Sequence, residues 1–337
     1  DLVMADVQVE AVFRARLHDP RWRKTESFIL GQSLERTEVI LEPLERVEAK
    51  PLLEPRHSTP LDWRAEVYKA LVLGTADYVR KNGFREVVIG LSGGIDSALV
   101  ACIACDALGA DNVVGVRMPS RFTAQQSIDD AQEVAANLGL RLLDIPVEPA
   151  YTAFLEMLAP IFANRKADTA EENIQARIRG TILMSLSNKF RWLVLTTGNK
   201  SEMATGYTTL YGDMAGGFAV LKDVPKTLVY ELTAYRNLLG SSPVIPQSII
   251  ERPPAAELRH NQKDSDTLPP YDILDPILKL YVEDDRSVAQ IIGLGHEAET
   301  VERTARLVDR SEYKRRQAPP GIKITSRAFG RDRRLPI

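Results

Sequence analysis

The chain is short of the side chains that most thiol and transition-metal chemistry requires. Only two of its 337 residues are cysteines and only four are histidines. Cys102 and Cys105 have the C-x-x-C spacing of some redox and metal sites, but no second pair accompanies them. Because they lie one helical turn apart in an apolar stretch, we expect them to pack in the core. The histidines form no H-E-x-x-H pattern, so a zinc hydrolase site is not indicated.

Long apolar runs and a strong net charge are also missing. No stretch is apolar for long enough to span a membrane. The formal net charge is −3, so nothing in the composition indicates nucleic acid or a membrane surface as a partner. The apolar and charged fractions are those of an ordinary globular protein. Together these features fit a cytoplasmic location.

One stretch combines a buried strand, a glycine turn and the start of a helix. Residues 87–97 read VVIGLSGGIDS. The β-branched run at 87–89 predicts a strand, and the apolar residues that follow Ser97 predict a helix. Glycines let backbone N–H groups approach an anion, and the dipole of the helix favours negative charge at its N-terminus. The stretch therefore predicts a phosphate cradle. A tight turn that needs glycine for backbone reasons alone is the alternative.

The loop departs from the common P-loop, because no lysine follows its glycines. It carries Asp96 instead, a carboxylate that is favourable beside phosphate when a divalent cation lies between the two. The sequence SGGIDS resembles the pyrophosphate loop of the ATP pyrophosphatase family, whose members split ATP between its α and β phosphates. The resemblance implies that the ATP phosphates are bound by Gly90, Ser92, Gly93, Gly94, Asp96 and Ser97.

Strands and helices alternate along the middle of the chain. Strands are predicted at 87–89, 112–118, 140–147 and 192–197. Helices are predicted from Thr59–Pro60 to Asn82–Gly83, from a capping box of Thr123 and Gln126 to Gly139, and over a long region at 151–190. The alternation predicts an α/β fold, a parallel twisted sheet with helices on both faces, Rossmann-like and of the ATP pyrophosphatase type, followed by a helical C-terminal part. Loops at 92–97, 119–123 and 197–202 should converge at the carboxyl edge of this sheet.

The stretch at 196–226, TTGNKSEMATGYTTLYGDMAGGFAVLKDVPK, follows the last of these strands and should lie at the same edge. Thr197 offers a hydroxyl to a nucleotide. Glu202 is a second carboxylate, which could hold Mg²⁺ together with the loop aspartate. Its alternative role is that of a helix N-terminal carboxylate. Lys222 and Lys226 could balance phosphate charge, although either alone is more often a surface lysine.

Four motifs now occur in order: SGGIDSA, ENIQARIRG within 171–180, the stretch at 196–226, and EYKRRQAPPGIKI near the C-terminus. Together they resemble NAD⁺ synthetases, and more narrowly the synthetase domain of the glutamine-dependent form. The resemblance implies that residues 59–337 form the synthetase (ATP pyrophosphatase) domain. Residues 1–58 would be a remnant of a preceding nitrilase-like glutaminase domain and its linker.

The resemblance implies an ATP-dependent amidation of deamido-NAD to NAD⁺ through an adenylated carboxylate, releasing AMP and pyrophosphate. Ammonia would come from the glutaminase domain, and the chain would form a homodimer or higher homo-oligomer. No side-chain nucleophile is expected. Asp96 and Lys226 would act in catalysis, Thr197 and Lys226 would contact ATP, and Asp96 and Glu202 would bind Mg²⁺. Contacts to deamido-NAD would come from Asn173, Arg177, Glu202 and Lys314.

Two positions depart from the family pattern. Ala255 stands where relatives commonly have a small hydroxyl residue for ATP. That contact could come from Ser248 or from the backbone, or be missing. Leu210 stands where ammonia-dependent relatives often have lysine, which favours the glutamine-dependent branch.

The Pro-rich stretch at 241–271 is either disordered or a lid. The alternatives to an NAD⁺ synthetase are another ATP pyrophosphatase ligase, GMP-synthetase-like or tRNA-modifying, and a non-catalytic adenine-nucleotide binding module.

Overall fold

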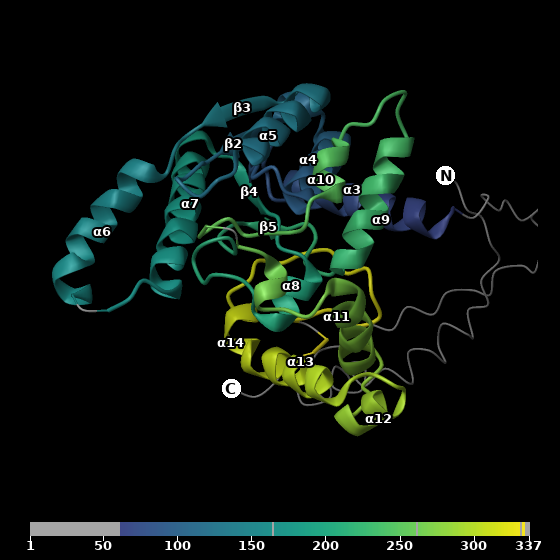
Figure 1. Cartoon of the computed structure of the whole chain (residues 1–337). Helices are drawn as coiled ribbons and strands as arrows, with labels where there is room; N and C mark the ends of the chain where they lie inside the picture. The colour runs from purple at the N-terminus through teal and green to yellow at the C-terminus, as the bar shows by residue number, and fades with distance from the viewer. Residues whose placement is uncertain (1–60, 164, 261, 331, 334–337) are drawn as a thin grey trace, which may run out of the picture. The chain divides into compact units, whose positions relative to one another are not determined.

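The computed structural model describes residues 61–163, 165–260, 262–330 and 332–333 (Figure 1). The chain divides into two compact units, and the second begins at Asp62. The expected domain remnant at 1–58 and the expected helix start at Thr59–Pro60 lie outside the described residues. Within the described part, no helix is both long and apolar enough to cross a bilayer.

A parallel sheet lies at the centre of the second unit. Its strands are β1 (Val87–Gly90), β2 (Val113–Arg117), β3 (Arg141–Asp144), β4 (Leu193–Thr196) and β5 (Phe218–Ala219). Their order is β3-β2-β1-β4-β5, and every neighbouring pair is parallel. The order reverses between β1 and β4, and a ligand crevice opens at such a switch point beyond the carboxyl ends of the strands. The predicted α/β fold is confirmed.

Helices surround this sheet and form the C-terminal part (Figure 1). Those before the fourth strand are α3 (Trp63–Lys81), α4 (Ile95–Leu108), α5 (Gln125–Leu138), α6 (Glu148–Phe162) and α7 (Thr169–Phe190). Those after it are α8 (Lys200–Thr205), α9 (Lys226–Leu238), α10 (Gln247–Glu251), α11 (Tyr271–Leu278), α12 (Val288–Gly293), α13 (Ala298–Arg310) and α14 (Glu312–Arg315). A π-helical turn at Lys279–Glu283 extends α11.

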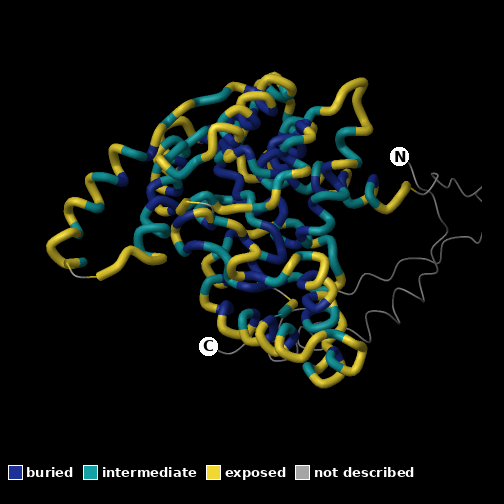
Figure 2. The backbone as a smooth tube through the Cα atoms, in the orientation of Figure 1, coloured by how far each residue is buried: buried dark blue, intermediate teal, exposed yellow. Residues whose placement is uncertain are grey.

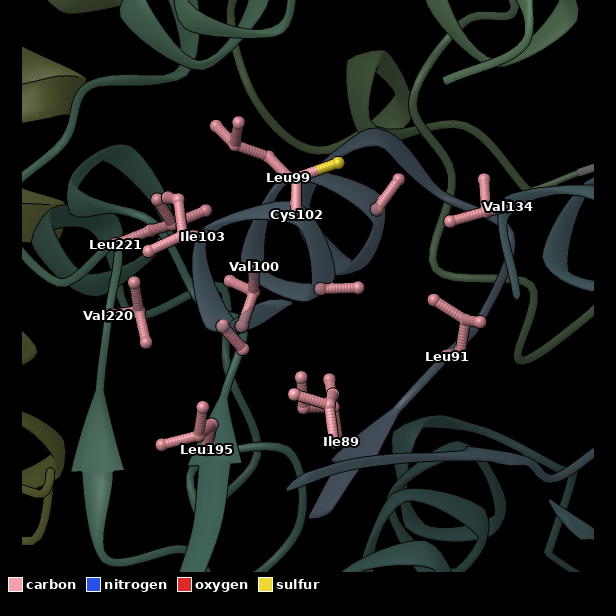
Figure 3. Packing of buried hydrophobic residues seen from close by; sticks show 14 of the residues in the cluster. Ile89, Leu91, Leu99, Val100, Cys102, Ile103, Val134, Leu195, Val220 and Leu221 are labelled. Carbon is pink, nitrogen blue, oxygen red and sulfur yellow. The ribbon is translucent and has the colours of Figure 1, made fainter. Parts of the chain in front are cut away.

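Each face of the sheet has its own apolar layer because neighbouring strand residues point to opposite sides. Ile89 and Leu195 pack with α3, α4, α5 and α9, and Figure 3 shows the side chains of α4 above them. Val88 and Val194 pack on the other face with Leu183 of α7. Burial on both faces explains why these strands are continuous apolar runs rather than alternating ones. Figure 2 shows the buried backbone concentrated in this centre.

The two cysteines lie where the sequence predicts. Both are free thiols, and Cys102 is fully buried within α4 (Figure 3). Burial raises the pKa of each thiol to about 12, so both stay protonated and unreactive at neutral pH. The core-packing interpretation is therefore confirmed.

Several predicted boundaries were wrong for local reasons. The hydroxyl of Thr123 accepts the Ser120 N–H at 3.0 Å and closes a turn, so the capping box does not form and α5 begins at Gln125. The long region at 151–190 is two helices, because Asp168 starts α7 with a capping box of its own. Helix α3 begins after Asp62, whose carboxylate accepts the Arg64 N–H at 3.2 Å.

Candidate active site

The loop between β1 and α4 is shaped by one glycine and two serines. Gly93 has a φ of +80°, and a Cβ there would lie 2.1 Å from the carbonyl oxygen of Ser127 on α5, so no other residue fits. The hydroxyl of Ser92 accepts the Gly94 N–H at 3.2 Å, and the hydroxyl of Ser97 donates to the Gly94 carbonyl at 2.9 Å. The loop is thus held open over the N-terminus of α4, which carries N–H groups without intrahelical partners.

A cavity of about 300 Å³ lies against this loop at the carboxyl edge of the sheet. Residues from all three loops that were predicted to converge line it, at 92–97, 119–123 and 197–202. Of the residues predicted to contact ATP, those that line the cavity are Gly90, Ser92, Gly94, Asp96, Ser97, Thr197 and Lys226. Gly93 is not among the lining residues, since it faces α5.

The first acidic side chain of the cavity is paired before any ligand binds. Oδ1 of Asp96 accepts from the Asn199 amide at 2.9 Å, and Oδ2 forms an ion pair with the ammonium of Lys226. Lys226 is only 2% exposed. Burial by itself would lower the pKa of Lys226, but the charges of Asp96 and Glu202 outweigh it and raise that pKa. Lys226 therefore stays protonated, with its charge paired to Asp96 at the start of α4.

Of the two roles that the sequence left open for Glu202, the structure shows that of a carboxylate at the N-terminus of a helix. Its Oε2 accepts the Asn199 N–H at 3.2 Å, and the side chain of Asn199 accepts the Glu202 N–H at 3.0 Å, which is a capping box for α8. Glu202 also lines the cavity. Burial and the nearby charge of Asp96 raise the pKa of Glu202 well above its usual range. Two carboxylates that repel each other in this way are a favourable place for a cation.

The residues expected to contact deamido-NAD gather around a different loop. Asn173 accepts from the Thr209 hydroxyl at 2.7 Å, and the exposed Arg177 donates to the Leu210 carbonyl at 3.2 Å. The ammonium of Lys314 donates to the carbonyls of Gly206 and Thr208, at 2.7 and 2.8 Å. None of Asn173, Arg177 and Lys314 lines the cavity beside the phosphate loop. The structure therefore brings Asn173, Arg177 and Lys314 together on residues 206–210. Of the four residues expected to contact deamido-NAD, only Glu202 lines the cavity beside the phosphate loop.

A second cavity, of about 410 Å³, adjoins the first. It lies between α7 and the residues after Leu210, and Gly180 and Ala215 line both cavities. The Cβ of an alanine at 180 would lie 2.8 Å from the carbonyl oxygen of Gly212, so glycine lets α7 approach this loop closely.

Two arginines of the first cavity were missed in the sequence. Arg179, which would suit solvent beside Arg177 on a helix, lines the cavity and donates to the Met118 carbonyl at 3.1 Å. Burial lowers the pKa of Arg179 to about 10. Arg252 also lines the cavity, donates to the Gly93 carbonyl and to the Ser127 hydroxyl, and pairs with Asp130. In the sequence, only the motifs that surround Arg179 and Arg252 pointed to these two residues. Such motifs do not distinguish a buried arginine from an exposed one.

Two other expected contacts point elsewhere. Lys222 donates to the Pro319 carbonyl at 2.6 Å and is not among the residues that line the cavity. Ser248 donates to Asp130 at 2.6 Å, so it does not replace the hydroxyl that is missing at Ala255, which does line the cavity. The structure therefore brings Lys226 but not Lys222 to the nucleotide site.

The Pro-rich stretch is ordered where it meets the cavity. The carboxylate of Glu257 accepts from the Ser127 hydroxyl at 2.5 Å, and the Leu258 carbonyl accepts from the Gln175 amide at 2.8 Å. Residues 252–258 therefore rest on α5 and α7 and form one wall of the cavity.

Comparison with known proteins agrees with this arrangement. The family model described as NAD synthase matches residues 67–318. A glutamine-dependent NAD(+) synthetase of Acinetobacter baylyi is 58% identical over 277 residues, 82% of this chain and 51% of that protein. The chain spans about half the length of the curated relatives it matches first.

Solved structures give the same result. A glutamine-dependent NAD⁺ synthetase from Acinetobacter baumannii in complex with ADP is 52% identical, with a TM-score of 0.59 over 84% of this chain and 52% of that one. An NMN synthetase from Francisella tularensis is 29% identical, with a TM-score of 0.64 over 75% and 96%. The matched residues include the phosphate loop, α7 and the loop that follows β4. The chain therefore belongs to the NAD synthase family.

Proposed function

We propose that this chain amidates deamido-NAD to NAD⁺ at the expense of ATP, releasing AMP and pyrophosphate. The observation that carries the proposal is the adjoining pair of cavities, one against the phosphate loop with Lys226 and the other against α7 and the loop after Leu210. ATP would occupy the first. The dinucleotide would reach the second from residues 206–210, where Asn173, Arg177 and Lys314 gather without lining either cavity. The names of the relatives support this assignment.

The chemistry requires little covalent participation from the protein. The nicotinate carboxylate attacks the α-phosphorus of ATP, and the bond to the bridging oxygen of pyrophosphate breaks. Ammonia then attacks the carbon of the acyl adenylate, AMP leaves with the bonding electrons, and the nitrogen loses protons. The N–H groups at the start of α4 and the ammonium of Lys226 would stabilise the charge that develops on pyrophosphate. No side-chain nucleophile takes part.

We also propose that Asp96 and Glu202 hold Mg²⁺. The fit rests on their chemistry, since both are carboxylates in the same cavity, and burial together with the charge of Asp96 raises the pKa of Glu202. Both oxygens of Asp96 have partners, yet each carboxylate oxygen has a second lone pair for a cation. Magnesium would supply further charge neutralisation at the phosphates. No group of three or more potential metal ligands occurs among the described residues.

A direct assay tests the activity. The purified chain is supplied with ATP, Mg²⁺, deamido-NAD and ammonium, and NAD⁺, AMP and pyrophosphate are measured together. We expect equal amounts of the three products, with no AMP formed when deamido-NAD is omitted. Folded protein that forms no NAD⁺ would refute the proposal. Cleavage of ATP to AMP and pyrophosphate only when a different carboxylate or carbonyl substrate is supplied would instead favour another ATP pyrophosphatase ligase. Binding of ATP without cleavage in the presence of any of these substrates would favour a non-catalytic nucleotide module. Nicotinate mononucleotide is the competing substrate to test, because one structural relative is named an NMN synthetase.

The metal assignment has a test that does not need turnover. Binding of Mn²⁺, a paramagnetic substitute for Mg²⁺, is measured with α,β-methylene-ATP, which cannot be cleaved at the α–β position. We expect Glu202→Gln to weaken Mn²⁺ binding about tenfold, the loss of one charged ligand. Glu231→Gln is the matched control, because Glu231 only pairs with Arg64 on the surface. Equal Mn²⁺ affinity in Glu202→Gln and the wild type would show that Glu202 is not a ligand.

We also propose which residues contact the second substrate, deamido-NAD. Arg177 and Lys314 would contact deamido-NAD, the arginine directly from its exposed position and the lysine beside the loop carbonyls that it holds. Asn173 would act from the same loop.

The rest of the protein is proposed from its relatives. Residues 59–337 would be the synthetase domain and residues 1–58 a remnant of a glutaminase domain that supplies ammonia, since the relatives are about twice as long and are named glutamine-dependent. A homo-oligomer is expected from the family. The free thiols of Cys102 and Cys105 support a reducing compartment such as the cytoplasm.

A further inference from the structure

Helix α9, which delivers Lys226 to the nucleotide cavity, begins without a cap of its own. Its N-cap residue is Pro225, which has no side chain that can accept a hydrogen bond. The first N–H groups of a helix have no intrahelical acceptor and must find one elsewhere, above all when they are buried. Lys226 is the first residue of α9, so the way these N–H groups are satisfied also fixes the position of the lysine.

The acceptors come from two other helices. The hydroxyl of Ser201 on α8 accepts the Lys226 N–H at 2.9 Å. Oδ2 of Asp275 on α11 accepts the Thr227 N–H and the Thr227 hydroxyl, both at 2.8 Å. Ser201 in turn donates to Oδ1 of Asp275 at 2.5 Å. Ser201 is fully buried and Asp275 is 7% exposed. Figure 1 shows the three helices meeting where α9 begins.

The same network reaches the second functional carboxylate. Ser201 lies between Asn199, which holds Asp96, and Glu202, which lines the cavity. The Lys200 N–H also donates to the Val224 carbonyl at 2.9 Å, so the starts of α8 and α9 are joined twice. A shift of Asp275 would therefore move the ammonium of Lys226 and the carboxylate of Glu202 relative to the phosphate loop.

We propose that Asp275 is a positioning residue for the reaction: together with Ser201 it caps α9 from outside the helix and sets where Lys226 and Glu202 stand in the nucleotide cavity. The inference rests on the proposed function for its kinetic consequence. A carboxylate is required because three donors aim at its two oxygens. An asparagine would place an NH₂ group against one of them and break the chain of hydrogen bonds.

The experiment compares variants that remove equal numbers of contacts at the two ends of α9. Asp275→Asn disturbs the end at the cavity. Asp106→Asn is the control, because Asp106 also accepts three hydrogen bonds, from Tyr68 and twice from Arg236, at the other end of α9. Ammonium-dependent kcat, the KM for ATP and Tm are measured for both. A misplacement of about 1 Å at a reacting centre can cost roughly 100-fold in rate, and we expect a fall in kcat of that order for Asp275→Asn alone.

A second pair of variants keeps the test decisive if Asp275→Asn does not fold. Thr227→Val removes one donor to Asp275, whereas Thr227→Ser retains it. We expect a fall of about tenfold in kcat for the valine variant, because it loses one hydrogen bond to a charged group. The serine variant keeps that hydrogen bond and should have a near-normal kcat. Equal kcat in the two Thr227 variants, or equal kcat in Asp275→Asn and Asp106→Asn at matched folded concentration, would overturn the proposal.

Binding of ATP alone separates this inference from the proposed activity. If the wild type forms no NAD⁺, the proposed activity is wrong, but the position of Lys226 still affects how tightly the chain binds ATP. Calorimetric titration with ATP should then show weaker binding for Thr227→Val than for Thr227→Ser. Identical affinities in that case would refute the role of Asp275 as well.

Discussion

The fit of Gly93 between the phosphate loop and α5 can be tested with one methyl group. Gly93→Ala would place a Cβ 2.1 Å from the carbonyl oxygen of Ser127. Carbon–oxygen contacts are ordinarily about 3.3 Å or longer, so the loop and α5 must separate by about 1 Å. The positive φ of +80° adds about 1 kcal/mol for any residue with a Cβ. Overpacking of this kind adds roughly 1–3 kcal/mol more.

Gly83→Ala is a matched control for the backbone strain. Gly83 ends the turn after α3 with a φ of +79°, and a Cβ there meets nothing within 4 Å. We expect it to lower the free energy of unfolding by about 1 kcal/mol and to leave turnover unchanged. Gly93→Ala should lose about 2–4 kcal/mol, the sum of strain and overpacking. Its turnover should fall about 100-fold, because the phosphate loop is displaced by about 1 Å.

Urea unfolding and the ammonium-dependent NAD⁺ assay measure the two effects separately. The comparison is made at a temperature where both variants are fully folded, so that turnover reports on the loop rather than on the amount of native protein. If Gly93→Ala matched Gly83→Ala in both stability and turnover, the loop would not be held against α5, and the argument that this contact positions the phosphates would fail.

Three further results are expected. Asp96→Asn leaves the charge of Lys226 buried without its ion pair and should lower the free energy of unfolding by about 3 kcal/mol, and adding Lys226→Met should restore stability but not turnover. Because burial and Asp96 raise the pKa of Glu202, its contribution to stability is fully present below its ordinary pKa of about 4.5 and is lost as pH rises through the raised value. In urea unfolding without ligand, Glu202→Gln should therefore gain stability relative to the wild type as the pH rises above about 4.5. Arg177→Ala should raise the KM for deamido-NAD about tenfold, because one hydrogen bond from a charged group is lost. Lys189→Ala, at the far end of α7, should leave this KM unchanged. If neither variant changed the KM, Arg177 would not contact deamido-NAD.

The sheet could be predicted because its signals are local. The apolar runs of β1, β2 and β4 follow directly from burial on both faces of a parallel sheet. The break between α6 and α7 also had a local signal, the capping box of Asp168 and Glu171, which was overlooked in a long helical pattern. β5 is only two residues long, and no periodicity can be read from such a segment.

The convergence of loops at the sheet edge could be predicted, but the partners of the side chains could not. Parallel strands bring their carboxyl ends together whatever the side chains are, which placed Thr197 and Glu202 beside the phosphate loop. The contacts of Arg252 with Gly93 and Ser127 depend on how a Pro-rich stretch folds back over α5. No local sequence pattern predicts that residues of this stretch pack against α5.

Lys226 shows why a site residue can be read as an ordinary surface lysine. Burying an ammonium is costly unless its charge is compensated and its neighbours are fixed. Here Asp96 on α4 compensates the charge of Lys226. Ser201 on α8 and Asp275 on α11 hold the start of α9 in place. Each partner is remote in sequence, so the burial of Lys226 becomes visible only in the fold. The same partners would let Lys226 turn from Asp96 to phosphate without rebuilding the start of α9, because the backbone N–H groups there are held independently of the side chain.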